Sequence, residues 1–375
     1  MTLHVVLDGR VINDHFPGIG RYAFDLAAAL AQHGDVHITL LYNPTAPSTR
    51  YDLAALVELA PAITLCPISI APFTVAEQAR IAPVARSLGA QVWHSLYYVM
   101  PFLGLPKPIV LTVYDLIPLV LPEYWSTRNR LIFRLAHRLA LRAATHIVTL
   151  SDSARRDVIR YFGVTPGRIS VTPLAAGERF KPAVQSAVTA IRAKYHLQAP
   201  YVLYVGINKP PKNLVRLIDA YARVAPNVEH DCVIAGAWDE RYLQAKQRAS
   251  ERGLAERVHF IGPIADDDLP ELYSGADLFV TPSLYEGFGL PVLEAMACGT
   301  PVACSHAASL PEVAGDAGLL FDPLDIDAIA QTIVRILTDR AMHDQLSRAG
   351  LARAAQFTWA RAATQTLEVY RAVIE

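Results

Sequence analysis

The chain has 375 residues, 52% of them hydrophobic, and its 34 lysines and arginines almost balance its 35 aspartates and glutamates. This length predicts two domains with sizeable cores, and the balanced charge argues against a nucleic-acid-binding protein. Every apolar stretch is shorter than the roughly 18–20 residues of a membrane span, and a strand-like run, not a signal peptide, follows the first residue. Four cysteines without metal spacing predict reduced thiols, no metal site and a cytoplasmic location.

Short β-branched runs alternate with loops and amphipathic helices along the whole chain. In the first half we expect strands at 3–7, 37–42, 91–94, 109–113, 145–150 and 169–171, and helices at 21–32, 126–143 and 154–162. In the second half we expect strands at 201–205, 232–235, 258–261, 278–280, 302–304 and 318–321, and helices at 184–194, 214–224, 239–252, 267–274, 290–298, 325–338, 340–355 and 358–375. This alternation predicts an α/β protein with two doubly wound parallel sheets. Prolines and glycines in 173–200 place the domain boundary near residue 178.

Polar groups in the first half lie where ligands bind in open α/β sheets. His94 and Tyr114-Asp115 lie at carboxyl ends of expected strands, and Gly18 and Gly20 form a glycine turn at a helix start. Each has an ordinary alternative: Asp115 caps the next turn, His94 is a satisfied loop residue, and the glycines only connect a strand to a helix.

Arginines recur every four residues on the expected helix 126–143, at positions 130, 134, 138 and 142. This spacing forms a basic stripe along one side of a helix. A solvated helix face explains it, and so does docking on an anionic membrane surface.

The stretch 281–301 is the most informative part of the second half. Glu286 precedes a turn that contains Gly287 and Gly289, and Glu294 follows in a short helix. A glycine turn at a helix start offers amides to a phosphate or a sugar oxygen, and carboxylates bind hydroxyls. Lys212, six residues after Gly206, can neutralise a diphosphate leaving group.

Together these motifs resemble glycosyltransferase family 4, whose members are retaining enzymes with the GT-B fold. The resemblance runs through residues 17–22, 94–97, 114–119, 151–155, 204–206, 212–213, 286–294 and 357–359. It implies two Rossmann-like domains facing across a cleft. Residues 1–178, with a helix at about 358–375 that crosses back, would bind the acceptor, and residues 179–357 would bind the donor.

The resemblance also implies roles for individual residues. Glu294 would hold the ribose hydroxyls, Glu286 would contact the hexose near its reacting end, and Lys212 would bind the diphosphate. The other implied donor-binding residues are Gly206, Asn208, Lys209, Gly287, Phe288, Gly289, Leu290, Gly18 and Gly20. The implied acceptor-binding residues are Arg21, His94, Ser151 and Arg155, and Tyr114 and Asp115 join Glu286 and Lys212 among the catalytic residues.

The implied reaction moves a hexose from a nucleotide sugar to a hydroxyl of a glycan or lipid-linked acceptor, with retention and without a metal. The donor phosphate would take the acceptor proton. GDP-mannose is favoured as donor, with UDP-glucose next. Two departures from the family pattern stand out: Tyr114 replaces a usual histidine, and Pro211 and Ile207 lie where an arginine is common. Lys209 would compensate for the missing arginine.

Three other functions fit parts of the sequence. A nucleotide-sugar epimerase shares this fold, but the Glu286-x7-Glu294 spacing argues against it. An inactive transferase-like binding subunit would explain Tyr114, although such a subunit has no need of Lys212 and both glutamates. A nicotinamide-dependent dehydrogenase is disfavoured because neither half contains G-x-G-x-x-G.

Overall fold

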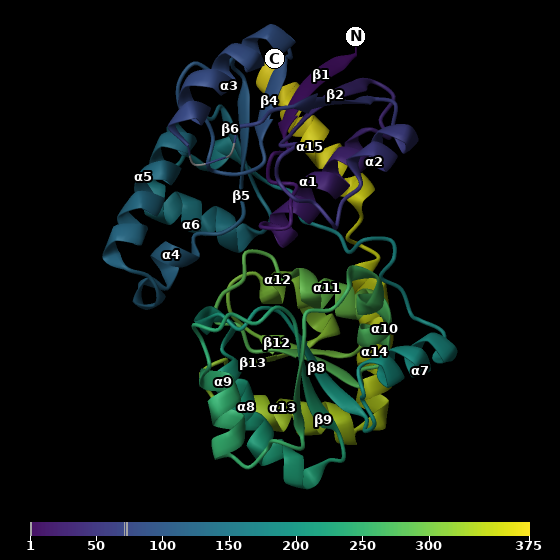
Figure 1. Ribbon diagram of the computed structural model, residues 1–375. Coiled ribbons are helices and arrows are strands. Elements are labelled where there is room, and N and C mark those ends of the chain that lie inside the picture. The colour runs from purple at the N-terminus through teal and green to yellow at the C-terminus, as the bar shows by residue number, and fades with distance from the viewer. Residues whose placement is uncertain (1, 71, 73) are drawn as a thin grey trace. The chain divides into compact units, whose positions relative to one another are not determined.

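The computed structural model describes residues 2–70, 72 and 74–375. Contacts within the chain divide it into two compact units. Unit 1 contains Met1–Leu174 and Thr358–Glu375, and unit 2 contains Ala175–Phe357 (Figure 1). Each unit is an α/β domain built on one parallel sheet.

The described part of unit 1 contains a seven-stranded parallel sheet in the order β3-β2-β1-β4-β5-β6-β7. Its strands are β1 (Leu3–Asp8), β2 (Val36–Tyr42), β3 (Ile63–Pro67), β4 (Val92–Ser95), β5 (Ile109–Val113), β6 (His146–Thr149) and β7 (Ile169–Val171). The direction in which strands are added reverses between β1 and β4. Every residue of β5 is buried, as expected for a parallel sheet with helices on both faces.

The helices of unit 1 are α1 (Pro17–Leu30), α2 (Leu53–Leu59), α3 (Val75–Leu88), α4 (Ile117–Val120), α5 (Thr127–Ala143), α6 (Asp152–Phe162) and α15 (Trp359–Ile374). Helix α15 follows unit 2 in the sequence but packs against α1. It buries Ala363, Leu367 and Tyr370, a spacing that places these side chains on one helical face. The expectation that the last helix returns to the first domain is therefore confirmed.

The described part of unit 2 contains a six-stranded parallel sheet in the order β10-β9-β8-β11-β12-β13. Its strands are β8 (Tyr201–Val205), β9 (Asp231–Ala235), β10 (Val258–Gly262), β11 (Leu278–Thr281), β12 (Val302–Ser305) and β13 (Leu319–Phe321). Its helices are α7 (Gln185–Lys194), α8 (Leu214–Val224), α9 (Gln244–Glu251), α10 (Leu269–Ser274), α11 (Leu290–Ala297), α12 (Leu310–Ala314), α13 (Ile326–Thr338) and α14 (Arg340–Ala354). The order reverses between β8 and β11.

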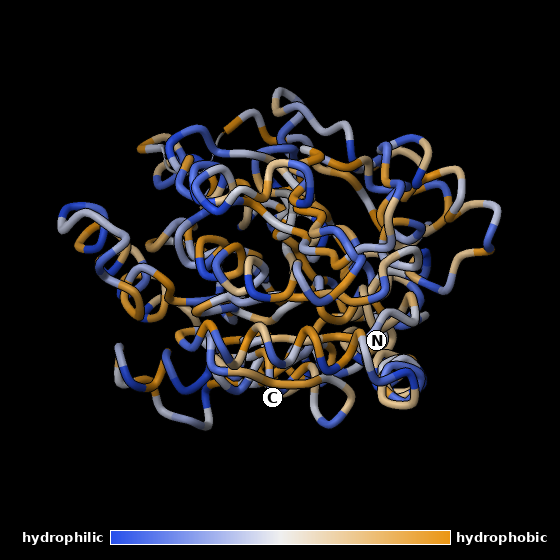
Figure 2. The backbone as a smooth tube through the Cα atoms, turned by 90° about the horizontal axis from the view of Figure 1, so that it is seen from below, coloured by the Kyte–Doolittle hydropathy of each residue, from blue (hydrophilic) through white to orange (hydrophobic). Residues whose placement is uncertain are grey.

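Hydrophobic and hydrophilic segments alternate along the helices (Figure 2). The apolar side of α8, for example, buries Leu217, Ile218 and Tyr221 in the core of unit 2. Among the described residues, no helix combines the length and the apolar character that a membrane crossing requires.

The predicted fold class, with two Rossmann-like parallel-sheet domains, is confirmed. Three details differ from expectation. Residues 43–90, where the sequence predicts neither a helix nor a strand, contain α2, β3 and α3. Helix α1 begins at Pro17 and not at residue 21, since proline suits the first turn of a helix. Helix α9 begins only at Gln244, because residues 239–242 form a loop bonded to Asn208.

Candidate functional site

The two sheets reverse strand order at corresponding places, and such reversals are where open α/β sheets bind ligands. In unit 2 the reversal lies between β8 and β11. The segment 206–213 follows β8, and the segment 282–289 follows β11. Neighbouring parallel strands thus bring Lys212 and Glu286 to the same edge.

Lys212 and Glu286 form an ion pair at this edge. The Lys212 Nζ donates to Glu286 Oε1 at 2.6 Å and to Oε2 at 2.8 Å. Ser283 also donates to Oε1, at 2.6 Å. The lysine side chain is 26% exposed and the glutamate side chain 16% exposed, so both groups remain accessible to a ligand. The structure brings together two residues 74 positions apart in sequence.

Backbone contacts fix the turn between Glu286 and α11. The Ser309 hydroxyl lies 2.8 Å from the Glu286 carbonyl and 2.7 Å from the Phe288 carbonyl, and it donates to them. Gly289 has a φ of 105°, and a Cβ there would lie 2.7 Å from Leu310 Cδ2, so only glycine fits. Helix α11 then begins at Leu290 without a side-chain cap. Ser309 was not among the predicted site residues, because its role depends on a contact that its own sequence neighbourhood does not reveal.

Glu294 lies inside α11 and is only 3% exposed. The Tyr273 hydroxyl donates to its Oε2 at 3.0 Å. Tyr273 comes from α10 and is fully buried, so it restricts the orientation of the Glu294 carboxylate. Phe288 is also buried, at 6% exposure, and its ring packs against Phe357.

The segment after β8 combines one exposed lysine with two asparagines that serve the fold. Asn208 bonds the loop at 239–242 through both its amide nitrogen and its oxygen, so its polar atoms are already used. Asn213 takes a left-handed conformation, with a φ of 61°, and donates to the carbonyls of Pro282 and Pro323. Lys209 is exposed. Gly206 packs so closely that a Cβ there would lie 2.7 Å from the Tyr204 hydroxyl.

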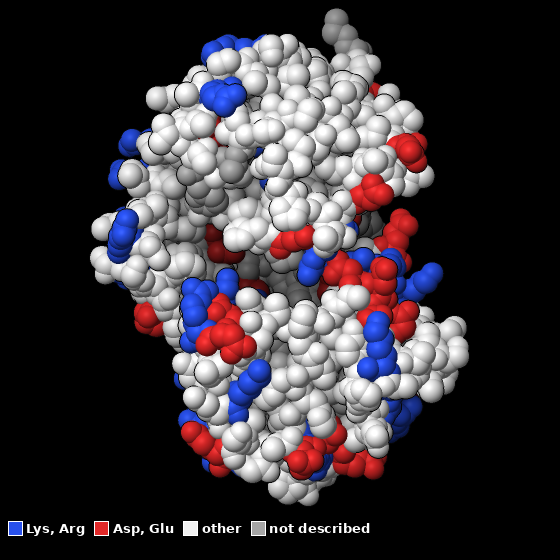
Figure 3. Space-filling model, in the orientation of Figure 1, with Lys and Arg blue, Asp and Glu red and all other residues white. Residues whose placement is uncertain are grey.

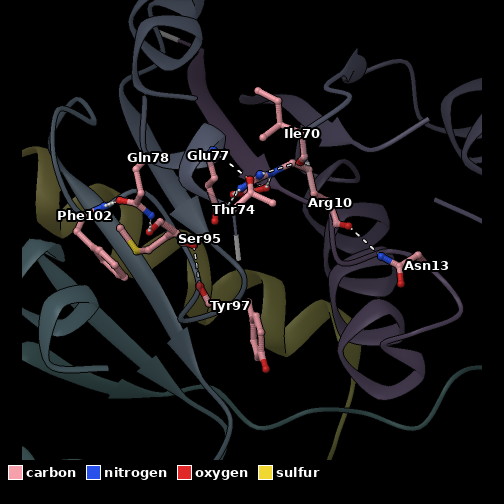
Figure 4. A network of polar contacts seen from close by, with 11 residues as sticks. Arg10, Asn13, Ile70, Thr74, Glu77, Gln78, Ser95, Tyr97 and Phe102 are labelled. Atoms are coloured by element: carbon pink, nitrogen blue, oxygen red, sulfur yellow. Dashed lines mark hydrogen bonds and ion pairs between the residues drawn. The ribbon is translucent and has the colours of Figure 1, made fainter. Parts of the chain in front are cut away.

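A buried ion cluster lies at the corresponding reversal of unit 1 (Figure 4). The Arg10 guanidinium donates to both carboxylate oxygens of Asp8, at 2.6 and 2.7 Å, and to Glu77 Oε1 at 2.7 Å. A further bond reaches the Ile70 carbonyl. Burial opposes the charge on Arg10, but Asp8 and Glu77 outweigh this effect and raise its pKa. None of the three was predicted, and Glu77 comes from a region where no helix was expected.

An open pocket of about 320 Å³ adjoins this cluster. The loops after β1 and β2 supply most of its lining, which comprises Arg10, Asn13, His15, Phe16, Asn43, Ala46, Pro47 and Pro72. The Asn13 amide is held by the Arg10 carbonyl at 3.0 Å. The cluster therefore supports one wall of the pocket.

His94 is a buried residue that bonds two side chains of unit 1. It is completely buried, and its ring nitrogens lie 2.6 Å from the Tyr370 hydroxyl and 2.8 Å from the Thr112 hydroxyl. Burial lowers the pKa of His94 to about 3, so the ring is neutral. The ring thus connects α15 to β5, and the acceptor-binding role expected for His94 stays a prediction.

Tyr114 and Asp115 at the end of β5 both bond to nearby backbone. The Tyr114 hydroxyl donates to the Leu96 carbonyl at 2.7 Å, and the Tyr22 ring lies edge-on to the Tyr114 ring at 5.5 Å. Burial, with Tyr22 and Tyr97 nearby, raises the pKa of Tyr114. Asp115 accepts from the Ile117 amide at 3.1 Å, which is the capping alternative considered for it.

The remaining predicted residues of unit 1 lie at two helix starts. Gly18, Gly20 and Arg21 belong to the first turns of α1, so the glycines form part of a helix instead of a free loop. Gly20 is closely packed, since a Cβ there would lie 3.1 Å from the Tyr51 ring. At the second start, Ser151 caps α6 by accepting from the Ala154 amide.

Arg155 lies one turn into α6 and is 37% exposed. Its Nη1 lies 3.5 Å from Asp152 Oδ1. Elsewhere in the described part of the chain, no group of three or more His, Cys, Asp or Glu side chains is placed to hold a metal ion.

Comparison with known proteins agrees with this architecture. Residues 17–175 match the model of "Glycosyltransferase Family 4", and residues 189–353 match "Glycosyl transferases group 1". The O-antigen chain mannosyltransferase B of Escherichia coli is 33% identical over 94% of this chain and 96% of that protein. The serotype-specific mannosyltransferase WbdA of Escherichia coli is 29% identical over the whole chain, which spans 48% of WbdA. Anabaena Alr3699/HepE, solved in complex with UDP-glucose, superposes with a TM-score of 0.78 at 20% identity over 99% of this chain and 100% of that one.

Proposed function

Because this chain belongs to glycosyltransferase family 4 of the group 1 glycosyl transferases, we propose that it moves mannose from a nucleoside diphosphate to a glycan or lipid-linked hydroxyl. Two similar proteins that cover the whole or nearly the whole chain are mannosyltransferases by name, which favours GDP-mannose as the donor. UDP-glucose comes next, since a protein of similar fold has been solved with it.

The observation that carries this proposal is the accessible Lys212–Glu286 pair at the sheet reversal of unit 2. Phosphate oxygens attract an ammonium strongly, and carboxylates accept hydrogen bonds from sugar hydroxyls. Lys212 would therefore bind the diphosphate, and Glu286 would bind the sugar. Donor binding would replace the direct bond between the two side chains with bonds to the substrate.

The neighbouring groups suit the rest of a nucleotide sugar. The amides of Gly287, Phe288, Gly289 and Leu290 lie at the uncapped start of α11, where partial positive charge favours phosphate or sugar oxygens. Glu294, oriented by Tyr273, would accept hydrogen bonds from the ribose hydroxyls. Lys209 is exposed in the segment after β8 and would supply a second positive charge.

The proposed reaction retains the anomeric configuration. The donor phosphate would accept the proton of the attacking hydroxyl while the bond between the sugar and the diphosphate breaks on the same face. Lys212 would stabilise the negative charge that develops on the leaving diphosphate. Glu286 would orient the hexose; the bond from Ser283, which does not depend on Lys212, suits a carboxylate that positions a substrate and does not attack it.

Unit 1 would bind the acceptor. Asn43 in the pocket beside Arg10 offers an amide group, and Phe16 offers an apolar ring, a combination that suits a sugar. Tyr114 already donates its hydroxyl proton to backbone, so it would contact a substrate through its ring. Arg21, Ser151 and Arg155, near the helix starts, would bind the acceptor, and Asp115 would be a catalytic residue.

A donor panel tests this function. The purified protein is incubated separately with GDP-mannose, UDP-glucose and ADP-glucose, and thermal stability and sugar release are followed. We expect GDP-mannose to stabilise the protein by about 2.7 kcal/mol at a hundredfold excess over its dissociation constant, and the first sugar released to keep the donor's anomeric configuration by NMR. Stabilisation with neither release nor transfer would favour a binding subunit, and no response to any donor would refute the proposal.

The variant Glu294→Gln keeps the size of the side chain but removes its charge. It should weaken donor binding at least tenfold, on the order of one charged hydrogen bond. The same substitution at Glu368, which is exposed on α15, serves as the control.

A further inference from the structure

We propose that helix α5 docks this protein on an anionic lipid bilayer, inserting aliphatic side chains while its arginines bind lipid headgroups. This inference goes beyond glycosyl transfer, because it concerns where the protein is held and not what it catalyses. It rests on three features of α5 in unit 1: an exposed apolar patch, an unpaired set of arginines and a fixed inner face.

The outer face of α5 exposes three large aliphatic side chains. Leu131, Ile132 and Leu135 are 62%, 57% and 59% exposed. Residues one turn apart lie side by side on a helix, so the three form one patch. Exposing single aliphatic residues is ordinary, whereas a contiguous patch on a helix indicates a surface that is covered in use.

The inner face explains why these side chains cannot turn inward. His137, Ala140 and Leu141 are buried against the rest of unit 1. The His137 ring stacks on Tyr98 with 3.9 Å between ring centroids, and its Nδ1 bonds the Phe133 carbonyl. This packing fixes the rotation of the helix about its axis. The aliphatic patch therefore faces outward as a consequence of the fold.

Arginines surround the aliphatic patch, and no acidic residue occurs in α5. The exposed ones are Arg128, Arg134, Arg138 and Arg142. Among the described residues, none of these four has a carboxylate partner within 4.0 Å. By contrast, Arg241, Arg252 and Arg257 of unit 2 are each paired with an aspartate. Figure 3 shows Lys and Arg side chains along the flank of unit 1 on which α5 lies.

A bilayer with anionic headgroups matches both parts of this face at once. Its hydrocarbon boundary accepts leucine and isoleucine, and long arginine side chains reach back to the phosphate level. Tyr124 and Trp125, 37% and 39% exposed just before α5, are the residue types found at membrane interfaces. A nucleic acid would bind the arginines but would not bury the aliphatic patch. A helix face that only contacts water would not carry three large aliphatic side chains.

Vesicle flotation with the full chain tests the proposal. Phosphatidylcholine vesicles with and without phosphatidylglycerol are mixed with the protein at low salt. We expect binding only when phosphatidylglycerol is present, and release when NaCl is raised several-fold, because salt screens the arginines. Binding that is equal on neutral vesicles, or absent on both kinds, would overturn the proposal.

Two double variants separate the contributions. Arg134→Gln with Arg138→Gln should weaken partitioning about fivefold for each arginine. Leu131→Gln with Leu135→Gln should weaken it at least tenfold while keeping helix propensity. The control changes two exposed leucines elsewhere, Leu59→Gln with Leu324→Gln, which are 82% and 61% exposed, and should bind like the unmodified protein.

Circular dichroism checks that every variant is folded. Sedimentation velocity without lipid tests whether a second copy of the chain binds this face of α5 instead. If the unmodified protein fails to float but forms a dimer that Leu131→Gln with Leu135→Gln dissociates, the patch binds a second copy and the lipid proposal is refuted. Equal flotation of the α5 leucine variant and the control would refute it as well. The donor panel above needs no vesicles, so the failure of either proposal is distinguishable from failure of the other.

Discussion

The two sheet reversals of this chain contain similar side-chain chemistry in opposite settings. In unit 1, Arg10 is 1% exposed between Asp8 and Glu77. In unit 2, Lys212 and Glu286 are 26% and 16% exposed. A cation between carboxylates at a strand end is thus not by itself a ligand site. Accessibility decides whether the charges stabilise the loop or remain available to a substrate.

The buried cluster of unit 1 contains one guanidinium and two carboxylates, and each carboxylate is stabilised in a different way. Glu77 lies in the first turn of α3, where the helix dipole favours a carboxylate. The bidentate bonds between Arg10 and Asp8 have the geometry in which guanidinium binds carboxylate most strongly. These contacts tie the loop after β1 to α3, and hence shape the pocket beside it.

The largest effect is expected from Arg10→Met, which tests whether the unit 1 cluster is structural. Removing the guanidinium takes away the positive charge that both buried carboxylates bind and should cost about 3–5 kcal/mol in the free energy of unfolding. Urea denaturation measures it. The triple variant Arg10→Met, Asp8→Asn, Glu77→Gln removes the charges together and should recover most of this loss. An unchanged urea midpoint for Arg10→Met alone would contradict the comparison.

Next comes Lys212→Met, which tests whether the unit 2 pair is functional. Losing one preorganised positive group at a developing charge should reduce kcat by about 10²–10³-fold, with a smaller effect on unfolding than Arg10→Met. Steady-state donor turnover measures it. Lys209→Met, in the same segment but without a bond to Glu286, should reduce kcat far less. Equal losses in the two variants would mean that net charge matters and not the pair.

A smaller effect is expected from Ser309→Ala, which asks how precisely the turn after Glu286 must be held. The variant removes the donor for two carbonyls and should lower the unfolding free energy by about 1–3 kcal/mol. It should also reduce kcat, because the turn positions Glu286. The control is Ser347→Ala, which removes a similar bond to the Gly299 carbonyl away from the turn. If both variants lower kcat equally, Ser309 has no special positioning role.

The smallest effect concerns pH and the buried histidine of α5. Burial lowers the pKa of His137 to about 3, whereas an unfolded histidine titrates near pH 6.5. Between these values the unfolded state binds more protons, so stability falls as pH is lowered, by up to about 1.4 kcal/mol per pH unit. His137→Phe keeps an aromatic ring beside Tyr98 and should give a shallower dependence. Urea denaturation at several pH values from about 7.5 down to 4.5 measures it, and an unchanged slope would show that His137 titrates normally.

Local patterns predicted most of the fold but not the region between β2 and β4. The strands of unit 2 and the pair Lys212 and Glu286 follow from apolar runs and glycines that are visible in sequence. Helix α3 has a readable start, since Thr74 accepts from the Glu77 amide as a helix cap. The contact that α3 makes with Arg10 cannot be read from the sequence. Glu77 binds Arg10 across 67 positions, and no periodicity indicates a contact at that separation.

The hydrogen bonds of His94, Tyr114 and Asn208 could not be predicted for the same reason. Sequence places each at a strand end, where ligands bind. Their hydrogen-bond partners come from other parts of the chain. Tyr370 bonds His94, the Leu96 carbonyl bonds Tyr114, and the loop 239–242 bonds Asn208. The family pattern identified these positions without revealing these bonds.

Helix α15 has a consequence for the order in which the chain can fold as it is made. Domains generally fold during synthesis from the amino-terminal end. Here unit 1 lacks α15, and therefore the Tyr370 hydroxyl that bonds His94, until all of unit 2 has been translated. All residues of unit 2 are therefore synthesised before the last residues of unit 1. Until then the surface of α1 that α15 covers stays open, so nascent chains halted before residue 358 should be the ones that engage chaperones.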